Sequence, residues 1–163
     1  MNARARLSVA PAVAGAVYVE YLVALLPFLL LALSGLQLLE LWTGQILMKR
    51  AALAAVRAAA VVLPDDPRFY DDLPAGRFEG ARKSAIELAA SLVLAPVPQF
   101  RELVDVQLEL PPGSALLTAT VRARFSCSLG FVSVVCGGGE RLLSAHASFP
   151  YQAARYVYSN SAS

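Results

Sequence analysis

The sequence predicts an α+β protein in which a long, partly transmembrane N-terminal helix is followed by a second helix and a small antiparallel sheet. An uncharged apolar run of nineteen residues lies near the N-terminus, at 21–39. Strong helix formers continue from this run to a turn rich in proline and aspartate. From residue 103 onwards apolar and polar residues alternate, as they do in half-buried strands.

The composition separates the chain into an apolar segment and a polar domain. Of the 163 residues, 57% are hydrophobic and 16% are charged, whereas a soluble domain has about 45–50% and about 25%. Only four of the 26 charged side chains (14 basic and 12 acidic) lie in the first 48 residues. This distribution excludes a disordered chain, a collagen-like scaffold and a multi-pass membrane protein. The net charge of +2 without a basic stripe gives no support for a nucleic-acid partner.

The apolar run 21–39 predicts one membrane crossing, because a helix of that length spans roughly 28 Å. A cleaved secretory signal is the first alternative, since Arg4 and Arg6 precede the run. Its small-residue site, Ala12-Val13-Ala14, lies before the run, whereas signal peptidase cuts after it. A buried core helix is the second alternative, but such helices usually carry a polar face.

The orientation of the span is not decided by its flanking charges. Basic residues lie before it, at 4 and 6, and after it, at 49–57. Cys127 and Cys136 are suitably spaced for a disulfide that closes a short loop, which would persist on the oxidising side of the membrane. The bridge therefore predicts an extracytoplasmic C-terminal domain. The alternative is two buried free thiols in a cytoplasmic domain.

A glycine and a glutamate stand five positions apart at the edge of the span. Glu20 is costly there, because a carboxylate at mid-membrane costs about 2.5–3.5 kcal/mol and less near the interface. A cut after Gly15 would give Ala16 a cationic α-amine at a similar depth. Glu20 could then pair with its own amine at i,i+4 or with that of a neighbouring subunit, which would fix the register between helices.

These residues resemble the prepilins of the type IV filament class. The resemblance is carried by the leader MNARARLSVAPAVAG, the spacing from Gly15 to Glu20, the Glu20-Tyr21 pair and the following LVALLPFLLLALSGLQLLELW. The Glu-Tyr pair is similar to the tight-adherence (Tad) branch, and the size and layout resemble its TadE-like pseudopilins. Ala16 stands where type II secretion pseudopilins usually have Phe, and their Phe-Thr-Leu-Ile-Glu pattern is absent, which disfavours that alternative.

The resemblance implies cleavage between Gly15 and Ala16 by a prepilin peptidase on the cytoplasmic face. It implies a minor pilin or pseudopilin that joins or initiates a thin adhesive pilus, with a role for Glu20 and Tyr21 in assembly and register. The expected location is the bacterial inner membrane, with a single pass and a cytoplasmic N-terminus. The implied partners are the prepilin peptidase, other pilin subunits, the inner-membrane assembly platform and the lipid bilayer. The alternative is a signal-anchored extracytoplasmic binding or adhesion domain, or a type II secretion pseudopilin.

The chain therefore divides into a leader, a helix in two parts, a loop and a domain. The expected bounds are 1–15, 16–43, 44–63, 64–76 and 77–163. Pro27 lies within the span and removes one backbone hydrogen bond, so it predicts a helix kink or a melted turn; the alternative is an inert membrane proline. The helix should end near Val62, because Pro64-Asp65-Asp66-Pro67 follows.

The four aspartates of 64–76 do not have the spacing of a calcium loop, so a solvated turn is expected. A second helix is predicted over 77–94. Strands are predicted over 103–110, 117–125 and 141–149. The apolar residues of that helix should share one side: Phe78, Ala81, Ala85, Ile86, Leu88 and Leu92.

The residues between the two cysteines are unusually apolar. They either fold back onto the helix or expose a patch that meets another subunit.

No enzyme is expected, because the sequence lacks converging catalytic groups. The one histidine, His146, has no partner for a metal site, and a G-x-S-x-G nucleophile pattern is absent. Gly137-Gly138-Gly139 lacks the lysine and helix of a phosphate-binding loop. Neither a cofactor nor a metal is therefore predicted.

Overall fold

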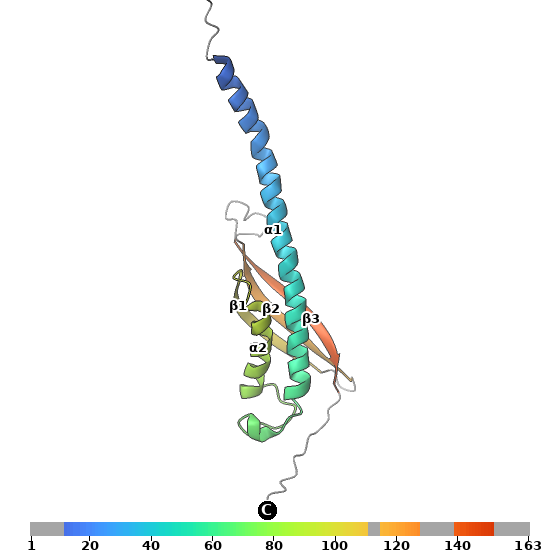
Figure 1. Cartoon of the computed structure of the whole chain (residues 1–163). Helices are drawn as coiled ribbons and strands as arrows, with labels where there is room; N and C mark the ends of the chain where they lie inside the picture. Colours follow the sequence, from blue (N-terminus) through green and yellow to red (C-terminus); the bar gives the residue numbers. More distant parts are fainter. Residues whose placement is uncertain (1–11, 111–114, 128–138, 152–163) are drawn as a thin grey trace, which may run out of the picture.

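A computed structural model of the protein describes residues 12–110, 115–127 and 139–151 (Figure 1). It confirms the α+β prediction of a long N-terminal helix, a second helix and a small antiparallel sheet. The three strands are neighbours in the order β1-β2-β3, and both pairs are antiparallel. The elements in chain order are α1 (Ala12–Val62), the 3-10 helix η1 (Pro67–Phe69), α2 (Gly80–Leu94), β1 (Phe100–Glu109), β2 (Leu116–Ser126) and β3 (Glu140–Pro150).

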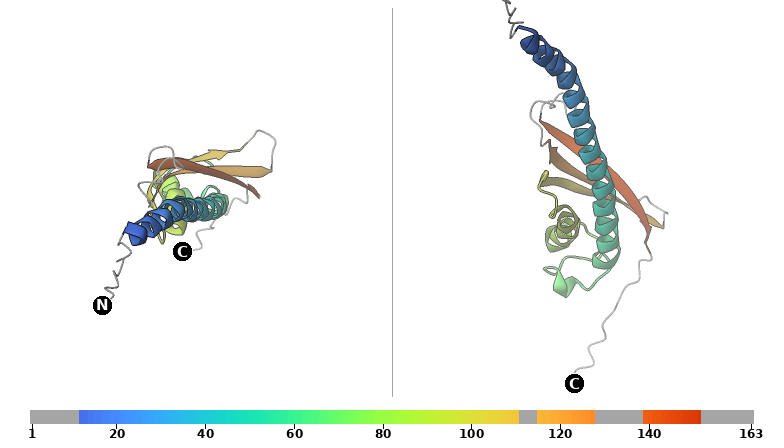
Figure 2. Two further views of the ribbon diagram at one scale, coloured as in Figure 1. Left: turned by 90° about the horizontal axis from the view of Figure 1, so that it is seen from above. Right: turned by 45° about the horizontal axis from the view of Figure 1, so that its top comes forward.

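The two long helices cover one face of the sheet, so the domain has two layers (Figure 2). Helix α1 contacts β2, β3 and α2, whereas α2 contacts β1. With 51 residues, α1 is about 77 Å long at ~1.5 Å per residue. Its N-terminal part extends well beyond the sheet (Figure 1).

The buried residues of α1 begin at Gln37 and recur at alternating spacings of four and three, which keeps them on one side of the helix. Most of them are small, so α1 approaches the sheet closely. At Gly44 an added Cβ would lie 3.1 Å from Cε2 of Phe125. The buried positions are Gln37, Leu41, Gly44, Met48, Ala51, Ala52, Ala55, Val56 and Ala59.

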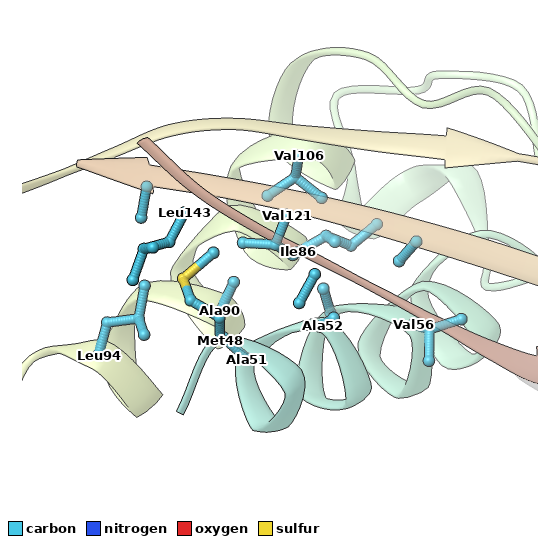
Figure 3. Close-up of a cluster of buried hydrophobic side chains, with 14 of the residues drawn as sticks. Met48, Ala51, Ala52, Val56, Ile86, Ala90, Leu94, Val106, Val121 and Leu143 are labelled. Atoms are coloured by element: carbon cyan, nitrogen blue, oxygen red, sulfur yellow. The ribbon is translucent and has the colours of Figure 1, made fainter. Parts of the chain in front are cut away.

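Strand β2 alternates between a buried apolar face and a polar face. Its buried residues face the helices and meet side chains of α1 and α2 in the core (Figure 3). On the polar face, Arg122 is in register with Asp105 and Arg124 with Glu102. These opposite charges suit a solvated face. The buried residues of β2 are Leu117, Ala119, Val121, Ala123 and Phe125.

The predicted apolar side of the second helix is only partly its buried side, because Ile86 is buried but two of the predicted leucines are not. Leu88 and Leu92 are 58% and 64% exposed. The buried face instead repeats every four residues and consists of Arg82, Ile86, Ala90 and Leu94. The helix also begins at Gly80 rather than at residue 77, because Gly80 has a left-handed φ of +54° that interrupts a helical path.

Helix α1 ends at Val62, as the proline-rich turn predicted. In that turn Asp66 accepts a hydrogen bond from the backbone N–H of Arg68 and begins η1. The Arg68 side chain also binds Asp66, at 2.7 Å from Nη2 to Oδ2, and this bond lowers the pKa of that carboxyl. Asp71 and Asp72 are exposed and have positive φ values, as a solvated turn allows.

Cys127 is disulfide-bonded. Its predicted partner Cys136 lies outside the described residues, and so does the whole apolar loop between the two cysteines. The pairing and the placement of that loop therefore stay predictions.

Candidate functional site

The N-terminal half of α1 presents apolar side chains to its surroundings on all sides. From Tyr18 to Leu36 no described side chain is buried, and Gln37 is the first that is. Helix α1 thus changes its environment at Gln37, from no protein cover to the core of the domain. The exposed large side chains of this half are Tyr18, Val19, Tyr21, Leu22, Val23, Leu26, Phe28, Leu29, Leu30, Leu31 and Leu36.

By length and composition, α1 is the one helix in the described part of the chain that could cross a membrane. Only 6% of its most apolar 18-residue stretch is buried within the protein. The core helix of a soluble domain would be mostly buried, so this exposure disfavours the core-helix alternative. A surface of this kind requires lipid or another apolar surface to cover it.

The predicted processing site lies in the first turns of this half. Gly15 and Ala16 are within α1, which begins at Ala12 instead of at the predicted Ala16. The alanines at 12, 14 and 16 are strong helix formers and account for the earlier start. The side chains of residues 12–17 are outside the described set.

Glu20 and Tyr21 lie at the start of the exposed half and are themselves exposed. Residues 16 and 20 are both helical and four positions apart, which places them on one face of α1 with a rise of about 6 Å between them. The helix thus brings the backbone nitrogen of Ala16 and the position of Glu20 within one turn of each other.

The polar side chain of Ser34, inside the apolar half, is satisfied by the helix itself: its hydroxyl donates to the carbonyl oxygen of Leu30 at 2.6 Å. Beyond Gln37, the Thr43 hydroxyl donates to the carbonyl oxygen of Leu39 at 3.0 Å. Pro27 lies within the helix and has no N–H to donate to the carbonyl of Val23. Helix α1 continues through this position, and the kink or melted turn on filament entry stays a prediction.

A groove lies where the exposed half of α1 meets the domain. It runs between α1 and β3 and has a volume of about 440 Å³. Trp42, which is 67% exposed, forms part of its wall. Its lining is apolar at Leu38, Trp42, Ile46 and Leu143, and basic at Lys49 and Arg141.

Among the described residues, no group of three or more His, Cys, Asp and Glu side chains is placed to hold a metal ion. His146 is exposed and lies in register with Thr120 on the polar face of the sheet.

Three residues that the sequence analysis did not single out have structural roles in the described part of the chain. Gln37 begins the buried stripe of α1, Gly44 allows close contact with the sheet, and Arg82 is fully buried between the helices and the turn. A glycine at position 44, which lacks a side chain and falls in a series of buried residues spaced three or four apart, is the one signal in the sequence. Neither a family model, nor a curated protein, nor a solved structure matches the chain.

Proposed function

We propose that this protein is a minor pilin or pseudopilin similar to the TadE-like subunits of the tight-adherence branch. It would be a structural subunit or assembly initiator of an adhesive pilus, processed by a prepilin peptidase after Gly15. The observation that carries the proposal is the division of one continuous helix at Gln37. Its first half is apolar and exposed from Tyr18 to Leu36, with Glu20 near its start, and its second half belongs to the core of the α+β domain.

An apolar helix without protein cover suits a subunit that moves between a membrane and a filament. In the membrane, lipid covers the exposed half, since its length matches one bilayer crossing. In a filament, the same side chains on neighbouring subunits cover one another. Because the second half of the same helix packs against the sheet, force applied to the helix is transmitted directly to the domain.

In this proposal, Glu20 sets the axial register between neighbouring subunits. Its carboxylate is costly at the membrane edge unless it has a partner. Cleavage after Gly15 supplies the α-amine of Ala16, and the helical spacing allows a pair within one chain or between neighbouring chains. A pair between chains forms at one axial offset only, so it selects the stagger of adjacent helices.

The alternative, a signal-anchored extracytoplasmic binding or adhesion domain, would use the same span without cleavage. In that protein Glu20 would lie in the headgroup layer and the leader would remain attached. The two functions therefore differ in the N-terminus of the mature chain.

Intact-mass measurement after coexpression with a tight-adherence prepilin peptidase separates them. The membrane-extracted chain should begin at Ala16, and Gly15→Val should block this processing. Gly35→Val is the matched control, because it changes a glycine of the same helix and should leave cleavage intact. A native chain that retains Met1 in the presence of the active peptidase would contradict the pilin function.

A further inference from the structure

The groove between α1 and β3 combines an apolar wall with two cations. Lys49 on α1 and Arg141 on β3 line it together with Leu38, Trp42, Ile46 and Leu143. Within the described residues neither cation takes part in an ion pair, whereas Arg68 and Lys83 both do. Among the residues that the structure describes, no acidic side chain lines the groove. It therefore offers positive charge beside an uncovered apolar surface.

The groove lies at the outer edge of the expected membrane span. Leu38 falls within the uncharged run 21–39, so this end of the groove is at the depth of the acyl chains. Lys49 is ten residues beyond Leu39, or about 15 Å along the helix axis. Helical side chains lean towards the N-terminus, which here is towards the membrane, and a lysine stem extends that reach. The ammonium group of Lys49 is thus brought close to the headgroup layer.

We propose that this groove binds one anionic phospholipid of the leaflet facing the domain. The phosphate is held by Lys49 and Arg141, and an acyl chain lies along Leu38 and Trp42 into the bilayer. The inference rests on the membrane insertion of α1 that the proposed function includes. A cation near an anionic membrane surface contributes about 1 kcal/mol, and a phosphate shared by two such groups suits the charge of the groove.

A phospholipid accounts for both ends of the groove. Its headgroup neutralises the two cations, and its chain covers the apolar wall where Trp42 is 67% exposed. Tryptophan favours this interfacial depth because its ring is apolar and its N–H is polar. In a second copy of the chain, the carboxylates that flank the uncharged run, Glu20 and Glu40, lie about 30 Å apart along the helix, so only one of them would reach the two cations.

Trp42 is the single tryptophan of the chain, so its fluorescence reports on this groove alone. The full chain is reconstituted in phosphatidylcholine vesicles that contain an equal minor fraction of acyl-brominated phosphatidylglycerol or acyl-brominated phosphatidylcholine. Bromine quenches tryptophan only at short range. We expect the brominated phosphatidylglycerol to quench Trp42 at least about threefold more effectively.

Lys49→Gln/Arg141→Gln should abolish this preference. Arg50→Gln/Arg57→Gln removes the same charge from exposed positions of α1 and should retain it, which separates a bound lipid from a general surface attraction. Equal quenching of the native chain by both lipids would overturn the inference and leave membrane insertion standing. Quenching by neither lipid would overturn both. Loss of quenching together with cross-linking between Ile46→Cys chains would assign the groove to a second copy instead.

Discussion

Arg82 of α2 binds the end of α1: its Nη1 donates a hydrogen bond to the carbonyl oxygen of Leu63 at 3.2 Å and another to that of Val62. The last carbonyls of a helix have no partner within the helix and form the negative end of its dipole. Nη2 of the same side chain donates to the backbone carbonyl oxygens of Asp65 and Leu73 at 3.0 and 3.2 Å. The guanidinium also lies 4.5 Å from the ring centroid of Tyr70. One buried cation thus joins both helices and the turn between them.

Removing this cation should destabilise the domain. Arg82→Met leaves several buried carbonyl oxygens without a donor, so we expect the free energy of unfolding to fall by about 2–5 kcal/mol. Urea unfolding of the detergent-solubilised chain measures this loss. Arg68→Met is the control, because its solvent-exposed ion pair with Asp66 should contribute little to stability. Equal effects of the two substitutions would contradict the role of Arg82.

The end of α1 and the three strands could be predicted because their signals are local. Pro64 ends the helix through its own ring, and alternation along β2 reports which side chains face the core. The buried face of α2 could not be predicted in this way. The apolar pattern placed Leu88 and Leu92 on the same side as Ile86, but they are exposed. Which side of α2 is buried depends on where α1 and the turn lie in space. Nη1 and Nη2 of Arg82 donate to main-chain oxygens nine to twenty residues away, and a sequence pattern does not report such partners.

Gly35 and Gly44 belong to the same helix, and only the second needs to be small. A Cβ at Gly44 would lie 3.1 Å from Phe125 and 3.3 Å from Leu143, whereas one at Gly35 would meet nothing within 4 Å. Gly44→Leu should therefore push α1 from the sheet and destabilise the domain by about 1–3 kcal/mol. Gly35→Leu should leave domain stability unchanged or raise it by up to about 1 kcal/mol through helix propensity. Hydrogen exchange of the β2 amides measures both effects, and similar protection in the two variants would argue against close packing at Gly44.

The turn after α1 should weaken at alkaline pH through Tyr70. Partial burial, and then the carboxylate of Asp65 at 3.3 Å from its hydroxyl, raise the pKa of Tyr70 above its ordinary value of 10.0. The folded state therefore favours the neutral phenol. This contribution is fully present below the pKa of the unfolded chain and is lost as the pH rises through the raised pKa of the folded one. The free energy of unfolding should fall more steeply above about pH 10 in the native chain than in Tyr70→Phe. Parallel pH profiles would show that Tyr70 does not titrate differently on folding.

Glu20 and Glu40 stand on either side of the uncharged run, but we expect only Glu20 to control assembly. Glu20→Ala removes a costly carboxylate from the membrane edge, so insertion should be unchanged or improved. It also removes the partner of the Ala16 amine, and the axial offset between neighbouring subunits is then no longer selected. Pilus assembly, or recruitment of the chain to its partners, should consequently fall at least about tenfold, since the loss of a pair worth about 1.4 kcal/mol changes an equilibrium constant that much. Cell fractionation measures insertion, and sheared-pilus yield with cross-linking measures assembly. Glu40→Ala, which removes the same charge at the other end of the span, should assemble at the native level. Native pilus yield from the Glu20→Ala chain would show that this carboxylate does not set the register.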